Sequence, residues 1–329
     1  MDSPSLVSPP LSSANAAGLR AVIEALPRTA EARAVLVVVL ETSGSTYRKP
    51  GAMLLRGGGI SVGWLSGGCL EAELELLADD VLREGRARLH SFNTTGDDDL
   101  LFGSASGCRG AITLLLMPTN GESPVIEALL TLNAGARSLQ LVLHEDGSGH
   151  AQSATRQWDW LARHSAPDRQ WSLQISAPPR LLLLGTGPEA GPLIRHAQEL
   201  GWKVEAIEHR GRWREHSRGA DVLRESTPEN AWKDITPDSF TAALVMGHHY
   251  ANDLCHLRHL AETRIGYVGL LGPPARRDAL LAELSEGART ELHTRLHAPV
   301  GLHLGGEGPE AIALAIVADL QRHLAGMAA

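Results

Sequence analysis

Residues 180–190 read RLLLLGTGPEA, in which four leucines are followed by two glycines and a proline. A short apolar run that ends in a glycine turn and opens into an amphipathic stretch is typical of a buried strand leading into a helix. The alternation continues toward the C-terminus and predicts a doubly wound parallel sheet with crossover helices. The predicted strands cover 181–184, 203–207, 242–246 and 266–270, and the predicted helices cover 188–200, 253–262, 273–285 and 309–324.

The glycine turn also has the pattern of a dinucleotide-binding fingerprint. Gly185 and Gly187 are followed by Ala190 as the third small residue, and Glu208 ends the next predicted strand about 20 residues later. Such a turn suits a pyrophosphate and such an acid suits a ribose hydroxyl, although Pro188 removes one N–H donor. The alternative is that the glycines only allow close packing in a Rossmann-like sheet.

The first half of the chain is predicted to be an α/β domain with glycine-rich turns. Residues 33–40 form a valine-rich run that suits a buried strand, and the apolar residues of 70–82 recur at helical spacing until Gly85. We divide the chain into a disordered leader (1–14), this domain (15–118), an extension and linker with weak periodicity (119–178) and the Rossmann-like domain (179–329).

Composition excludes several classes of protein. The 329 residues are 43% hydrophobic and 21% charged, with a formal charge of −8, which argues against a general nucleic-acid binder. The longest apolar runs, 34–40 and 311–318, are far shorter than the roughly 18 residues of a membrane span. We therefore expect a cytoplasmic protein that binds neither nucleic acid nor a membrane, with its three cysteines reduced.

Two of these cysteines occur in glycine-rich turns. One turn reads Ser66-Gly67-Gly68-Cys69 just before a predicted helix, and the other reads Gly107-Cys108-Arg109-Gly110. A helix N-terminus or an adjacent guanidinium favours the reactive thiolate. A single cysteine of this kind is more often a small buried structural residue, so both roles remain open.

Two further features are candidates for ligand binding. The loop that contains Ser45, Thr46, Arg48 and Lys49 has the chemistry to hold a phosphate, and a solvated turn is the alternative. His248 follows the predicted strand 242–246, at the edge where doubly wound sheets bind their ligands.

Together these motifs resemble those of the xanthine dehydrogenase accessory proteins, the XdhC/CoxI family. The resemblance covers nearly the whole chain after the leader and rests on many motifs in one order. Those motifs include Glu41-Thr42-Ser43-Gly44-Ser45-Thr46, Ser66-Gly67-Gly68-Cys69-Leu70-Glu71, Gly107-Cys108-Arg109-Gly110, Glu208-His209-Arg210, Val245-Met246-Gly247-His248 and His297-Ala298-Pro299-Val300-Gly301-Leu302.

The resemblance implies a chaperone that binds the molybdenum cofactor (molybdopterin), protects it, supports its sulfuration and inserts it into a xanthine dehydrogenase-type apoenzyme. It also implies a homodimer, a cysteine desulfurase as a partner, and an accessory factor rather than an enzyme. Cys69 and Cys108 are the candidates for contact with molybdenum or sulfur. The candidate cofactor-binding residues are Ser45, Thr46, Arg48, Gly67, Gly68, Cys69, Gly107, Cys108, Arg109, Gly185, Gly187, Glu208 and His248.

Two other functions remain compatible with the sequence. An NAD(P)-dependent oxidoreductase would use Gly185, Gly187 and Glu208 for a nucleotide and would tolerate loss of the cysteines. A structural assembly protein would capture its dehydrogenase partner without any small molecule.

Overall fold

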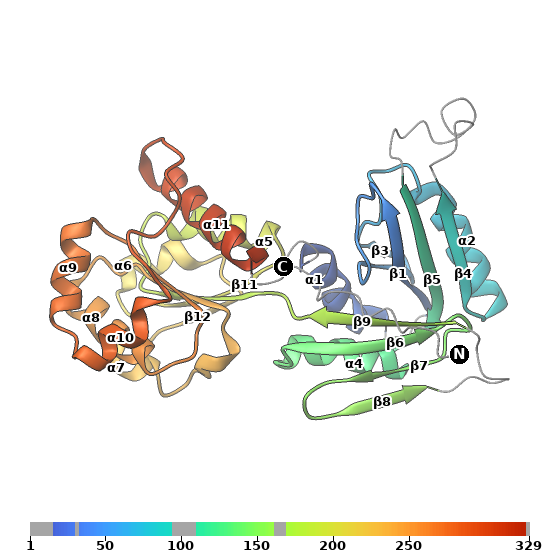
Figure 1. Cartoon of the computed structure of the whole chain (residues 1–329), viewed down its shortest axis with the longest axis horizontal. Coiled ribbons are helices and arrows are strands. Elements are labelled where there is room, and N and C mark those ends of the chain that lie inside the picture. Colours follow the sequence, from blue (N-terminus) through green and yellow to red (C-terminus); the bar gives the residue numbers. More distant parts are fainter. Residues whose placement is uncertain (1–15, 30–32, 94–109, 161–168, 327–329) are drawn as a thin grey trace. The chain divides into compact units, whose positions relative to one another are not determined.

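The computed structural model describes residues 16–29, 33–93, 110–160 and 169–326, and the chain divides into two compact units (Figure 1). Unit 1 comprises residues up to Ala177, and unit 2 comprises Pro178–Met327. No helix in the described ranges is long and apolar enough to cross a membrane.

Unit 1 contains a five-stranded antiparallel sheet in the order β3-β2-β1-β5-β4. The central strand β1 is buried on both faces. Its odd-numbered valines pack with α2 and its even-numbered side chains pack with α1, which explains why 34–40 is apolar at every position. The elements are α1 (Ala16–Ala25), β1 (Ala34–Gly44), β2 (Met53–Gly57), β3 (Ile60–Val62), α2 (Glu71–Glu84), β4 (Arg88–Asn93) and β5 (Gly110–Thr119).

The segment divided off as an extension and linker (119–178) folds into a helix and a second antiparallel sheet. This sheet has the order β8-β7-β6-β9, and its inner side chains, including Trp158 and Trp171, share one hydrophobic core with α1 and β1. In β9 the buried Trp171, Leu173 and Ile175 alternate with polar side chains, as expected for a strand with one covered face. The strands β7 and β8 have four residues each, too few for a clear period in the sequence. The elements are α4 (Pro124–Ala134), β6 (Ser138–His144), β7 (Gly149–Gln152), β8 (Gln157–Trp160) and β9 (Gln170–Ser176).

Unit 2 contains six parallel strands in the order β12-β11-β10-β13-β14-β15. In chain order this is 3-2-1-4-5-6, the Rossmann order, with its switch point between β10 and β13. The predicted fold class is thereby confirmed. The strands are β10 (Arg180–Leu184), β11 (Lys203–Ile207), β12 (Val222–Arg224), β13 (Ala242–Val245), β14 (Tyr267–Leu270) and β15 (Leu296–His297).

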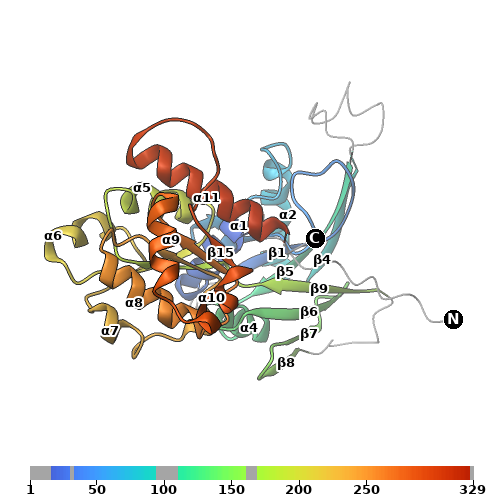
Figure 2. The same ribbon diagram turned by 60° about the vertical axis from the view of Figure 1, so that its left-hand side comes forward.

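Helices cover the parallel sheet. The helices α5 and α11 lie side by side (Figures 1 and 2), while α8, α9 and α10 share a hydrophobic cluster with β10, β13 and β14. The helices are α5 (Ala190–Glu199), α6 (Gly211–Arg214), α7 (Pro228–Ala231), α8 (Tyr250–Ala261), α9 (Pro274–Ala282), α10 (Glu286–His293) and α11 (Gly308–Gly326), with 3-10 turns at Leu26–Thr29, Glu215–Ser217 and Pro237–Ser239.

Candidate functional site

Unit 1 has a pocket of about 750 Å³, a volume that includes space open to solvent. The pocket lies where the loop after β1, the start of β5 and the start of α2 meet. Most of its walls are apolar, and its polar groups are hydroxyls and one thiol. The lining residues are Ser45, Thr46, Tyr47, Leu65, Ser66, Gly67, Cys69, Leu70, Phe92, Gly110 and Ile112.

The loop that carries Cys69 is fixed by its own hydrogen bonds. The buried Ser66 Oγ accepts from the N–H groups of Gly68 and Leu70, at 3.1 Å each, and donates to the Glu71 carboxylate. Glu71 also accepts from the Ser66 N–H at 3.2 Å. These bonds satisfy donors at the start of α2 and leave the Cys69 thiol exposed at the pocket.

Glycines at the pocket have two different roles: one allows a close backbone contact, and two leave the backbone beside Cys69 uncovered. A Cβ on Gly110 would lie 2.3 Å from the carbonyl oxygen of Ser45, so β5 can approach the loop after β1 only at a glycine. Gly67 and Gly68 have no atom within 4 Å of the corresponding position, and Gly68 has a φ of 115°. The backbone beside Cys69 is therefore accessible from the solvent.

The structure brings four of the predicted residues of unit 1 to this pocket: Ser45, Thr46, Gly67 and Cys69. Gly68 belongs to the same loop. Arg48 is not among the lining residues; its Nε donates to the Trp64 carbonyl at 2.9 Å and its guanidinium lies 5.5 Å from the Tyr47 ring centroid. The predicted residues Gly107, Cys108 and Arg109 lie outside the described residues.

Sequence reasoning missed the apolar walls of the pocket. Leu65 and Leu70 flank the glycine-cysteine motif, whereas Phe92 and Ile112 come from β4 and β5. Apolar residues beside a glycine motif are a weak signal, since most such residues simply belong to a core.

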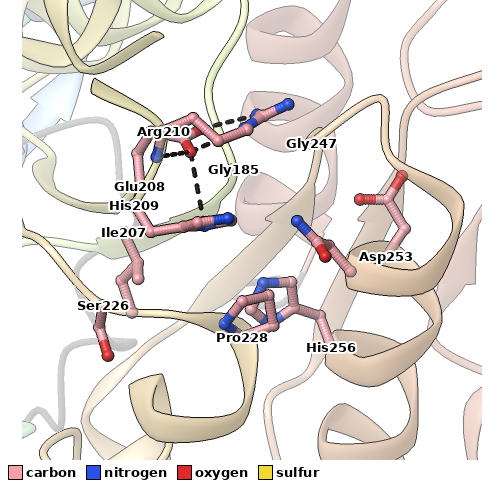
Figure 3. Close-up of a pocket in the computed structure, with 11 residues that line it drawn as sticks. Gly185, Ile207, Glu208, His209, Arg210, Ser226, Pro228, Gly247, Asp253 and His256 are labelled. Carbon is pink, nitrogen blue, oxygen red and sulfur yellow. Dashed lines mark hydrogen bonds and ion pairs between the residues drawn. The ribbon is translucent and has the colours of Figure 1, made fainter. Parts of the chain in front are cut away.

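Unit 2 has a smaller pocket, about 230 Å³, at the carboxyl ends of β10, β11 and β13 (Figure 3). Of the predicted residues, Gly185 and Glu208 line it, while Gly187 and His248 are not among its lining residues. The lining residues are Gly185, Ile207, Glu208, His209, Arg210, Ser226, Pro228, Gly247, Asn252, Asp253 and His256.

Glu208 is 1% exposed and its carboxylate is already occupied. It accepts a hydrogen bond from the Thr186 N–H at 2.9 Å. Arg210 donates three more to it, from its backbone N–H at 2.8 Å, from Nε at 2.9 Å and from Nη2 at 2.7 Å (Figure 3). Burial by itself would raise the pKa of Glu208, but the hydrogen bonds from Arg210 and Thr186 outweigh burial and hold this pKa below its usual value. Glu208 is therefore a carboxylate paired within unit 2.

Asp253 and His256 project from α8 into the same pocket (Figure 3). Asp253 is fully buried; its Oδ2 accepts from Arg276 Nη2 at 2.7 Å, whereas Oδ1 has no hydrogen-bond partner in the described part of the chain. Burial raises the pKa of Asp253 despite Arg276. Burial also lowers the pKa of His256 to about 4, and its Nδ1 accepts from Trp232 Nε1 at 3.3 Å, so the imidazole is neutral with its proton on Nε2.

His248 lies over the glycine turn in a strained backbone conformation, with a φ of 52°. Its Nε2 is 3.5 Å from Oε2 of the buried Glu189. This hydrogen bond is the main cause that raises the pKa of His248 and lowers the pKa of Glu189. The two side chains form an imidazole–carboxylate pair at the switch point of the sheet.

Metal binding by the described residues alone has no support. Within the described ranges no group of three or more His, Cys, Asp or Glu side chains is arranged to hold a metal ion. Cys69 is therefore not part of a preformed metal-binding cluster among the described residues.

Two family models match the chain. The model described as the XdhC and CoxI family matches residues 28–93, and the model described as the XdhC Rossmann domain matches residues 181–320. The second range covers the parallel sheet of unit 2, and the first covers the Cys69 loop.

Similar proteins match over nearly the whole chain. A protein of Bacillus subtilis described as a probable subunit of xanthine dehydrogenase is 30% identical and aligns with 87% of this chain and 92% of its own length. The molybdenum cofactor insertion chaperone PaoD of Escherichia coli is 27% identical, with 92% of this chain and 86% of its own length covered. A crystal structure described as a xanthine dehydrogenase from Bacillus halodurans has a TM-score of 0.76 and 29% identity, over 96% of both chains.

The predicted family resemblance is confirmed by these matches, which extend through both units. On the identity and coverage of its relatives, this chain belongs to the XdhC and CoxI family.

Proposed function

We propose that this chain is a molybdenum cofactor chaperone that carries the cofactor in the pocket of unit 1 and inserts it into a xanthine dehydrogenase-type enzyme. The observation that carries the proposal is the exposed Cys69 thiol at the edge of a largely apolar pocket of about 750 Å³. The chaperone name of the Escherichia coli relative supports the same role.

The donor set of the pocket fits this cargo. Molybdopterin has a flat polar ring, a sulfur-rich dithiolene and a phosphate, and a thiolate is a soft ligand that suits a sulfur-bound metal. Apolar walls such as Phe92 and Ile112 suit the ring, and the hydroxyls of Ser45 and Thr46 can donate hydrogen bonds to it. Cys69 would contact molybdenum or its sulfur. Cys108, two residues before the lining residue Gly110, is the second candidate thiol.

The proposal extends to the partners that the family resemblance implies. We propose that the protein works in the cytoplasm as a homodimer and receives sulfur for the cofactor from a cysteine desulfurase. Sedimentation of the purified protein tests the dimer, and co-purification with a tagged desulfurase tests that contact. A monomer in sedimentation would contradict the proposed homodimer. A desulfurase that never co-purifies would contradict the proposed sulfur donor.

The first experiment is to measure bound pterin. The protein is purified without oxygen from a host that makes molybdopterin, the released pterin is oxidised to its fluorescent form, and its amount per chain is compared among variants. We expect near-stoichiometric pterin in the wild type and at least a tenfold loss in Cys69→Ala. The matched control is Cys255→Ala, a half-buried cysteine of unit 2, which should keep the pterin of the wild type.

Two outcomes would contradict the proposal: a folded wild type that carries no pterin, or a Cys69→Ala variant that keeps all of it. A parallel Cys108→Ala variant tests the second thiol. Loss in only one of the two variants would identify the thiol that contacts the cofactor.

A further inference from the structure

The parallel sheet of unit 2 has the strand order and the glycine fingerprint of a dinucleotide-binding fold. Such a fold holds the pyrophosphate against its second glycine and uses a carboxylate at the end of the second strand for the ribose hydroxyls. Each of these positions can be compared with the contacts that unit 2 makes by itself.

Gly185, the first glycine of the turn, is explained by packing inside unit 2. Its φ is 78°, and a Cβ there would lie 2.4 Å from the Cα of Gly247. The turn after β10 and the turn after β13 are therefore in backbone contact. A glycine is required here whether or not any ligand binds.

The second glycine faces a carboxylate of the same chain. A Cβ on Gly187 would lie 2.6 Å from Glu189 Oε2 and 3.2 Å from the His248 ring. The side chains of Glu189 and His248 thus cover the side of Gly187 on which a pyrophosphate would bind. The negative charge of Glu189 would also repel a diphosphate. Pro188 contributes no N–H to the turn.

The ribose-binding acid is saturated. Glu208 accepts hydrogen bonds from two different N–H groups of the Arg210 guanidinium and from the backbone N–H of Arg210 and of Thr186. A carboxylate has about four lone-pair sites, so no acceptor is left for a ribose diol. The Thr186 N–H belongs to the glycine turn, and its bond to Glu208 removes a donor for phosphate as well. The nearby pocket, about 230 Å³, is smaller than a usual small-molecule site.

We infer that unit 2 is a dinucleotide fold closed by its own side chains, with Arg210 in the place of the ribose and Glu189–His248 in the place of the pyrophosphate. Unit 2 therefore does not take NAD(H) or NADP(H) through its glycine turn, and the chain does not work as a nicotinamide-dependent oxidoreductase. This inference is independent of the cargo proposed for unit 1, since no step of it involves the pterin.

The test is a titration of the full-length wild type with NADH and with NADPH to 1 mM, followed by nicotinamide fluorescence and by equilibrium dialysis. We expect no saturable binding of either nucleotide. Saturable binding below 1 mM would overturn the inference, whatever the pterin content of the protein.

A pair of variants tests Arg210 separately. Arg210 and Arg212 both lie near the Trp213 ring, at 5.3 and 5.2 Å from its centroid, but only Arg210 bonds Glu208. We expect Arg210→Ala to lower the melting temperature by about 4 °C or more, since it leaves Glu208 buried with fewer donors, and Arg212→Ala to leave it unchanged. Equal melting temperatures in the two variants would overturn the role of Arg210. If Arg210→Ala does not fold while Arg212→Ala does, that difference supports the pairing of Arg210 with Glu208. The titration of the wild type then tests nucleotide binding without any variant.

Discussion

At the scale of single residues, Gly110 is the point where the backbone of β5 comes closest to the loop after β1. We expect Gly110→Ala to lower the free energy of unfolding by about 2 kcal/mol, because the added Cβ would lie 2.3 Å from the Ser45 carbonyl oxygen and the backbone must move. Urea unfolding followed by fluorescence measures the change. The control is Gly67→Ala, where no atom lies within 4 Å. Equal stability of the two variants would show that the loop after β1 can move away from the added Cβ without a measurable loss of stability.

The His248–Glu189 pair makes a prediction about pH. The pKa of His248 is raised, so its contribution to stability is present below an unfolded pKa of about 6.5 and is lost as pH rises through the folded value. The pKa of Glu189 is lowered, so its contribution is present above about 4.3 and is lost as pH falls. The pair should therefore stabilise unit 2 most near pH 5.5, by a modest amount because His248 is half-exposed.

The variant for this test is His248→Asn, because asparagine tolerates the positive φ. We expect its melting temperature to fall further below that of the wild type at pH 5.5 than at pH 8.5. His303→Asn, in an exposed loop, should show no such difference between the two pH values. A His248→Asn deficit that is the same at both pH values would mean that the pair adds no electrostatic stability.

At the scale of elements, the start of α2 depends on Ser66. Its hydroxyl accepts from the N–H groups of Gly68 and Leu70 and donates to Glu71, so it ties the Cys69 loop to the helix. We expect Ser66→Ala to cost about 1 kcal/mol in denaturant unfolding, comparable to the loss of a helix cap. Under the proposed function it should also lower the bound pterin.

Ser61→Ala is the matched control for that change, since Ser61 is an exposed serine of β3. It should keep both the stability and the pterin of the wild type. If Ser66→Ala behaved like Ser61→Ala, the hydrogen bonds around Ser66 would not be needed to place Cys69.

The elements also differ in how well the sequence predicted them. In unit 2, β10, β11, β13 and β14 lie within one residue of their predicted ranges, because most of their residues are apolar and buried on both faces. The short edge strands β12 and β15 were missed, because two or three partly exposed residues carry no clear period. Strands β7 and β8 of unit 1, with four residues each, are also too short to show a clear period.

At the scale of the whole molecule, the hydrophobic cores follow the division into units. Among the described residues, the cores around β1 consist of residues of unit 1, and the cluster shared by α8, α9 and α10 consists of residues of unit 2. We expect a fragment of residues 178–327 to fold alone, with cooperative thermal unfolding by circular dichroism. A fragment of residues 203–327, which lacks the central strand β10 and α5, should not. A non-cooperative melt of the longer fragment would mean that unit 2 needs unit 1.

The sequence by itself determined the fold class of unit 2, the position of Cys69 just before a helix and the family of the chain. Apolar runs, helical spacing and glycine turns report local burial and backbone freedom, and these are properties of short segments. A dinucleotide fingerprint was visible at the same level, in Gly185 and Gly187.

Only the tertiary structure decided which side chains from other parts of the chain contact those segments. It brought Phe92 and Ile112 into the lining of the same pocket as Cys69, and it paired Arg210 with Glu208 at the position of the ribose. A sequence motif indicates which backbone N–H donors and which positions without a side chain a turn provides. Whether a ligand or the protein itself occupies them depends on side chains that the fold brings from other segments of the chain.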